Sequence, residues 1–101
     1  GADVNIQNKY GNTALTYAID RHPESVPLII NAGADVNIQN KYGDTPMHAA
    51  ASLGELEICE LLIQYGANVN VTNQYGKSPL NIASDKGYHD ISDLLKKHDI
   101  N

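Results

Sequence analysis

Residues 33–50 read GADVNIQNKYGDTPMHAA, and parts of this stretch recur elsewhere in the chain. The chain opens with GADVN at residues 1–5, and a near copy, GANVN, stands at residues 66–70. The three copies begin at Gly1, Gly33 and Gly66, so they are separated by 32 and 33 residues. A nearly fixed period of this length predicts an array of stacked structural repeats, in which each unit packs only against its neighbours.

Composition excludes several classes of protein. The 101 residues suit one domain, and an apolar content of 42% with six Tyr indicates an ordered chain. The formal net charge of −5 argues against a general nucleic-acid binder, because such a protein needs a basic face. The single Cys rules out an internal disulfide framework and suits a reducing compartment. No stretch approaches the roughly 20 apolar residues of a membrane span, so we expect no membrane insertion.

Each copy contains a turn followed by a helix start. The turns fall in NKYG or NQYG, at residues 8–11, 40–43 and 73–76, because Gly adopts positive φ at little cost. Thr45 then precedes Pro46, and a Thr hydroxyl can cap a helix whose first residue is Pro. Ser78-Pro79 repeats this pair, and Thr13 is predicted to cap the first copy without a Pro. Gly54 and Gly87 are predicted to end these helices.

A second helix is predicted from about Leu56 to Tyr65. Apolar residues fall on one helical stripe, and the third copy has a similar stripe. The stripe consists of Leu56, Cys59, Leu62 and Ile63 in the middle copy and of Ile91, Leu94 and Leu95 in the third. Lys96, Lys97 and His98 follow in the last turn, where cations favour the helix dipole.

The order of these motifs resembles the ankyrin repeat family. Thr45-Pro46-Met47-His48-Ala49-Ala50 is similar to the family's helix-start motif, with Met in place of Leu, and residues 61–70 are similar to its closing motif. The resemblance implies an all-α repeat solenoid, in which helix pairs stack and hairpin loops project sideways. It also implies a single domain over residues 1–101, with units at about 8–40, 41–73 and 74–101. Residues 1–7 would be the tail of a preceding unit.

The first and third copies depart from the middle one. The first is one residue short near His22 and has both Pro23 and Pro27, so we expect regular helix only from about Val26. The third has polar Asn81, Ser84 and Lys96 where the motif has His, Ala or an aliphatic residue. This substitution predicts a terminal capping unit, so that the array would end at residues 99–101. No matching polar cap exists at the start, which predicts either further repeats before Gly1 or self-association through this end.

No candidate for catalysis or metal binding stands out. By resemblance, Thr45, Pro46, His48, Gly33 and Gly66 have structural roles, and His48 is expected to bond to Thr45 and the adjacent hairpin. Cys59 lies on an apolar stripe, which favours a buried small side chain over a reactive thiol. His and Cys lack the spacing of a metal site, and no Gly-rich phosphate loop is present. We therefore expect no enzyme activity, no metal and no cofactor.

Exposed positions outside the motif are the candidates for binding a protein partner. By resemblance they line a concave face formed by hairpin tips and first helices. The tip residues are Lys9, Tyr10, Asn12, Lys41, Tyr42, Asp44, Gln74, Tyr75 and Lys77, and the helix residues are Asp20, Arg21, Ser52, Leu53, Asp85 and Lys86, with Tyr65 as an extension of the patch. Stacked helices lie about 8–10 Å apart, so the tip tyrosines should form a ladder. Tyr suits interfaces, but each ring could instead pack on the next hairpin.

The resulting hypothesis is a non-catalytic protein–protein interaction module that holds its partner on the concave face. The alternative is a regulatory or targeting segment of a larger enzyme, channel or host-directed effector. Partner identity does not follow from the motifs, because function lies in surfaces grafted on a generic scaffold. We expect an intracellular, cytoplasmic location, with host-directed secretion as the alternative.

Overall fold

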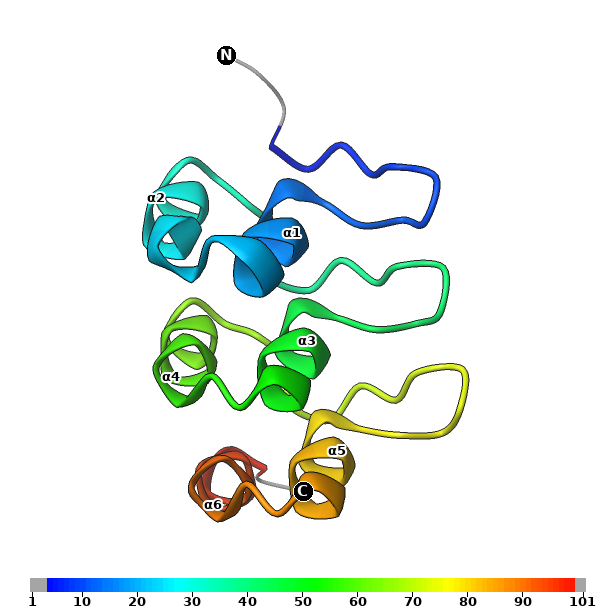
Figure 1. Ribbon diagram of the computed structural model, residues 1–101, viewed down its shortest axis with the longest axis vertical. Coiled ribbons are helices and arrows are strands. Elements are labelled where there is room, and N and C mark those ends of the chain that lie inside the picture. Colours follow the sequence, from blue (N-terminus) through cyan, green and yellow to red (C-terminus); the bar gives the residue numbers. More distant parts are fainter. Residues whose placement is uncertain (1–3, 100–101) are drawn as a thin grey trace.

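The computed structural model describes residues 4–99, and these residues form three stacked helix pairs (Figure 1). The helices are α1 (Ala14–Arg21), α2 (Val26–Asn31), α3 (Pro46–Leu53), α4 (Leu56–Gln64), α5 (Pro79–Lys86) and α6 (His89–His98), with a 3₁₀ turn η1 (Pro23–Ser25) between α1 and α2. No β-strand occurs in this part of the chain. The predicted all-α repeat solenoid is therefore confirmed.

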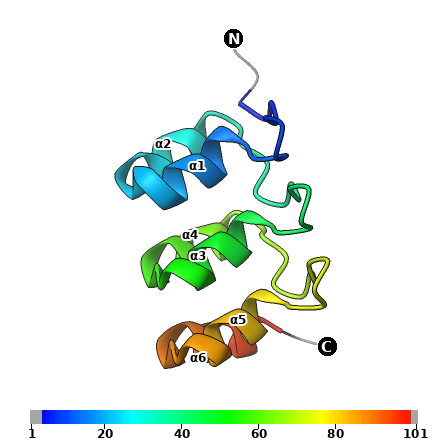
Figure 2. The same ribbon diagram turned by 45° about the vertical axis from the view of Figure 1, so that its right-hand side comes forward.

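The helices form two layers, and the hairpin loops project from one side of the stack. The first helices α1, α3 and α5 lie one above another, and α2, α4 and α6 form a second layer beside them, on the side away from the hairpins (Figures 1 and 2). Within the first layer, α3 packs against both α1 and α5. The largest fully buried side chains include Leu15, Met47, Leu62 and Leu95, which come from both layers. The core is thus a thin layer of buried side chains that runs along the stack.

The predicted apolar stripe on α4 matches the buried side of the helix only in part. Cys59 and Leu62 are buried as expected, but Ile58 is buried as well, whereas Leu56 and Ile63 are only partly buried. The reason is that α4 packs against both α3 and α6, so more than one side of the helix is covered.

Two of the three predicted helix caps are confirmed. The Thr45 hydroxyl accepts a hydrogen bond from the His48 backbone N–H, and Ser78 makes the same contact with Asn81. In each case the side chain three residues into the helix bonds back to the cap residue, which completes a capping box.

The prediction that Thr13 caps the first helix is wrong. Thr13 stands at the N-cap of α1 but makes no side-chain cap hydrogen bond within residues 4–99. Its hydroxyl instead lies 3.5 Å from the Thr16 hydroxyl. Thr16 occupies the position of His48 and Asn81, and its short side chain does not complete the box.

The irregular start of the second helix in the first unit is confirmed. Pro23 begins η1, and α2 begins at Val26 with Pro27 in its first turn, where a missing N–H costs no helical hydrogen bond. The C-cap that follows α1 is His22, with φ −141°, whereas the C-caps of α3 and α5 are Gly54 and Gly87 in the left-handed conformation.

The two ends of the stack differ in polarity. Polar side chains, those of Asn81, Ser84 and Lys96, are exposed in the last unit. At the other end the apolar side chains of Ile6 and Leu28 are 69% and 72% exposed. The expectations about residues 1–3 and 100–101 lie outside the described residues.

Candidate functional site

Backbone hydrogen bonds hold the hairpins of adjacent units in register. The Lys41 N–H donates to the Tyr10 carbonyl, and the Gln74 N–H donates to the Tyr42 carbonyl, both at 2.9 Å. Within each hairpin an Asn side chain accepts from two backbone N–H groups of its own turn, as Asn40 does from Tyr42 and Asp44. Each tip is therefore a rigid turn whose side chains stand at a fixed offset from those of the next tip.

Two residues predicted to contact a partner also link adjacent hairpins. The Asn12 side-chain oxygen accepts from Asn40 Nδ2 at 3.1 Å, and Asp44 Oδ1 accepts from Asn73 Nδ2 at 2.8 Å. Asn12 and Asp44 are half-buried rather than at the exposed tips. Their position in the sequence gave no sign of this, because the partner amide lies in the next unit.

The predicted tyrosine ladder is interleaved with lysines. Lys41 Nζ lies 5.3 Å from the ring centroids of both Tyr10 and Tyr42, and Lys9 Nζ lies 5.2 Å from that of Tyr10. Tyr75 is 69% exposed, compared with 37% for Tyr42. Gln74 stands where the other two tips have lysine, and no further hairpin follows in the described chain to flank Tyr75. The rings are thus exposed enough for contact, with the ammonium groups held over their faces.

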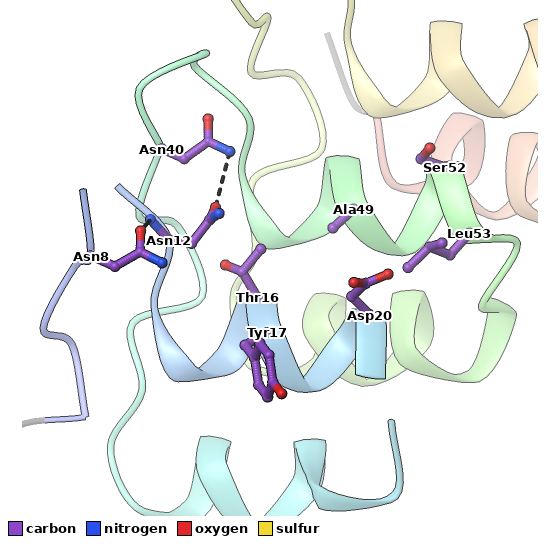
Figure 3. Close-up of a pocket in the computed structure, with 9 residues that line it drawn as sticks. All are labelled: Asn8, Asn12, Thr16, Tyr17, Asp20, Asn40, Ala49, Ser52 and Leu53. Atoms are coloured by element: carbon purple, nitrogen blue, oxygen red, sulfur yellow. Dashed lines mark hydrogen bonds between the residues drawn. The ribbon is translucent and has the colours of Figure 1, made fainter. Parts of the chain in front are cut away.

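A hollow of about 340 Å³ lies between the hairpins and the first helices (Figure 3). Thr16, Tyr17 and Asp20 of α1 face it from one side, and Ala49, Ser52 and Leu53 of α3 from the other. Asn8, Asn12 and Asn40 of the hairpins complete its wall. Of these residues, Asn12, Asp20, Ser52 and Leu53 are among the partner contacts predicted from the sequence.

The hollow continues along the stack into a second one of about 220 Å³. Thr16, Asn40, Ala49 and Ser52 line both, and the second extends to Asn73 and Ile82 of the last unit. Sequence reasoning missed Tyr17, Ala49 and Ile82, which occupy the same place on α1, α3 and α5. Their position, the fourth residue of each first helix, was the available signal, because a repeat places equivalent residues on one face.

The acidic candidates on the first helices, Asp20 and Asp85, are each paired with another candidate residue. Arg21 Nε lies 3.0 Å from Asp20 Oδ2, and Lys77 Nζ lies 3.0 Å from Asp85 Oδ2. All four side chains are about half or more exposed, so these pairs add little to stability. Lys86 and Leu53 are exposed beside them.

Tyr65 lies apart from the other candidates. It follows the end of α4, and its hydroxyl donates to Asn31 Oδ1 at the end of α2, at 3.1 Å. Tyr65 therefore belongs to the second-helix layer and does not line the hollows.

His48 and Cys59 have the structural roles expected of them. His48 is buried, its Nδ1 accepts from the Thr45 backbone N–H at 3.0 Å, and its Nε2 lies 2.9 Å from the Lys77 carbonyl. A neutral ring with its proton on Nε2 satisfies both contacts. Burial, with smaller contributions from Glu55 and Glu60, raises the pKa of the fully buried Cys59 thiol to about 12, so this thiol is a poor nucleophile at neutral pH.

Two further kinds of function find no support in residues 4–99. No group of three or more His, Cys, Asp or Glu side chains is arranged to hold a metal ion in this part of the chain. None of its helices combines the length and apolar character needed to cross a bilayer.

Comparison with known proteins gives one family. The sequence matches the family model described as ankyrin repeats (3 copies) over residues 20–101. The curated proteins contain no significant match. The match begins inside α1, but the described part of the first unit has the same turn, helix and second helix as the other two.

Proposed function

Because this chain belongs to the ankyrin repeat family, whose members are generally protein–protein interaction modules, we propose that it holds a protein partner in the groove between its hairpins and first helices. The groove is defined by the two connected hollows between residues 8–20, 40–53 and 73–82. The observation that carries the proposal is the combination of this hollow with exposed Tyr and Leu side chains along its edges. The module performs no catalysis of its own.

A groove variant tests the proposal. Changing Tyr42, Leu53 and Tyr75 together to Ala removes three exposed side chains from the tips and the α3 rim, so helical content should be unchanged by circular dichroism. Capture of partners by the immobilised chain, quantified by mass spectrometry, should fall for this variant.

A matched control lies on the second-helix layer. Glu57, Glu60 and Gln64 are exposed on α4, and their triple Ala variant should retain all captured partners. Equal capture by the groove variant and the wild type, or selective loss in the α4 variant, would remove the groove from the proposal.

We further propose that the module acts in a reducing intracellular compartment, which the single buried Cys supports. A regulatory or targeting segment of a larger protein could use the same groove. The coding sequence on either side distinguishes these settings, since a flanking enzyme or channel domain favours the second.

We propose that the N-terminal end of the stack is covered in one of two ways, by further repeats before Gly1 or by self-association, and self-association can be tested with this chain. Ile6 and Leu28 are exposed there, whereas the equivalent residues of the next unit, Ile38 and Leu61, are partly covered. Sedimentation velocity should detect concentration-dependent dimers that Leu28→Lys abolishes. A monomer at every concentration would contradict this surface.

A further inference from the structure

Charge is distributed unevenly over the stack. Five of the seven Lys and Arg residues lie in the hairpin and first-helix segments, residues 8–21, 40–53 and 73–86, which hold only three of the twelve Asp and Glu residues. The groove side therefore carries a small net positive charge, although the whole chain is acidic. The remaining nine carboxylates lie outside these segments, where only Lys96 and Lys97 oppose them.

The lysines at the first two hairpin tips differ in their contacts from Arg21 and Lys77. Arg21 and Lys77 are paired with Asp20 and Asp85, whereas Lys9 and Lys41 form no ion pair within residues 4–99. Their ammonium groups lie over the rings of Tyr10 and Tyr42 and remain accessible on an exposed edge. Two cations held at fixed positions beside a groove favour an anionic ligand.

The adjacent hollow has room for a bulky side chain and has an apolar side next to its polar one. Its volume of about 340 Å³ exceeds the roughly 150 Å³ cavity that takes up benzene in an engineered protein core. Tyr17 and Leu53 border it as exposed large hydrophobic residues, and Ala49 leaves room at the centre. Its one carboxylate, on Asp20, is already paired with Arg21.

We propose that the partner segment is an extended acidic peptide with one bulky aliphatic or aromatic residue. The bulky side chain enters the hollow between α1 and α3, and flanking carboxylates contact Lys9 and Lys41. This inference rests on the proposed function and adds the chemistry of the partner.

Selection from a phage-displayed library of random twelve-residue peptides tests the inference. Enriched peptides should contain one Leu, Ile, Met, Phe, Tyr or Trp flanked by Asp and Glu. Two rim charges contribute modestly, so Lys9→Glu with Lys41→Glu should weaken these peptides about fivefold to tenfold and should select Lys- and Arg-rich peptides instead.

Two further variants separate charge from shape. Lys96→Glu with Lys97→Glu makes the same change in net charge on α6 and should leave binding unaltered. Ala49→Tyr places in α3 the residue that α1 has at the equivalent position, Tyr17, and should block the hollow without disturbing the helix. Circular dichroism of every variant should match the wild type.

The outcomes distinguish this inference from the proposal on which it rests. Acidic peptides that are lost in both the tip-lysine and Ala49→Tyr variants support both. Peptides blocked by Ala49→Tyr but free of acidic enrichment overturn the acidic-partner inference and leave the groove intact as a binding site. Peptides insensitive to both variants overturn both, and failure to enrich any peptide overturns the inference.

Discussion

Replacing His48 by Ala should destabilise the array through the junction between its second and third units. His48 is 1% exposed, and its two ring nitrogens bond to the Thr45 backbone N–H in its own unit and to the Lys77 carbonyl in the next hairpin. The variant leaves the Thr45 N–H buried without a partner, at a cost of about 1–3 kcal/mol, and removes a bond across the junction worth about 1 kcal/mol. We expect a total loss of about 3 kcal/mol, a large share of a stability of about 5–15 kcal/mol.

Asn81 provides a matched control in the last unit. It stands at the equivalent helix position and completes the same capping box, with Oδ1 accepting from the Ser78 N–H at 3.0 Å. Asn81 is exposed, so water can replace its contacts, and Asn81→Ala should cost only about 1 kcal/mol. His48→Asn should fall between the two, because Asn can restore the cap but not the bond to Lys77.

Urea unfolding followed by far-UV circular dichroism measures these differences as shifts in midpoint at constant m. Because stability in an array depends on the junctions between units, His48→Ala should also expose the amides of α5 and α6 to hydrogen exchange before those of α1. The reasoning is refuted if His48→Ala costs no more than Asn81→Ala, or if exchange rises equally in all three units.

Two further predictions concern the hairpin stack and the buried thiol. Gly43 and Gly76 both have positive φ, but a Cβ at Gly43 would lie 3.0 Å from the Asn73 Cα, whereas a Cβ at Gly76 would have none of the surrounding described atoms within 4 Å. Urea unfolding should show that Gly76→Ala lowers the free energy of unfolding by about 1 kcal/mol, and that Gly43→Ala lowers it by at least about 1 kcal/mol more. Equal losses in the two variants would contradict the close hairpin contact. The pKa of Cys59 is raised from 9.0 to about 12, so the folded state retains this proton above pH 9, and the associated stability is full below pH 9 and declines as pH rises toward 12. The unfolding free energy of the wild type relative to Cys59→Ala should therefore fall by about 1 kcal/mol from pH 9 to pH 10, and a constant difference would contradict burial of the thiol.

The fold was predictable because its signals lie within each repeat. The spacing of the three copies, the Thr-Pro and Ser-Pro helix starts and the closing glycines each fall within a few residues of the element that they specify. Even the late start of α2 followed from Pro23 and Pro27, since the cost of Pro inside a helix depends only on the local backbone.

The groove was less predictable because it forms between repeats. Asn12 and Asp44 look like exposed tip residues until the amide of the next hairpin is placed beside them. Tyr65 falls in the wrong layer for the same reason, because its contact with Asn31 depends on how two units stack. Tyr17, Ala49 and Ile82 each line a hollow from the fourth position of a first helix, but they differ in residue type. Their common place in the groove therefore becomes visible only when the three helices are aligned by position.

Amide hydrogen exchange of the chain with and without a captured protein partner tests the groove most directly. The account predicts slower exchange in residues 8–20 and 40–53, which form the hairpins and first helices around the hollow, and little change in α2, α4 and α6. Protection confined to the second-helix layer, with the hairpins and first helices unchanged, would contradict it.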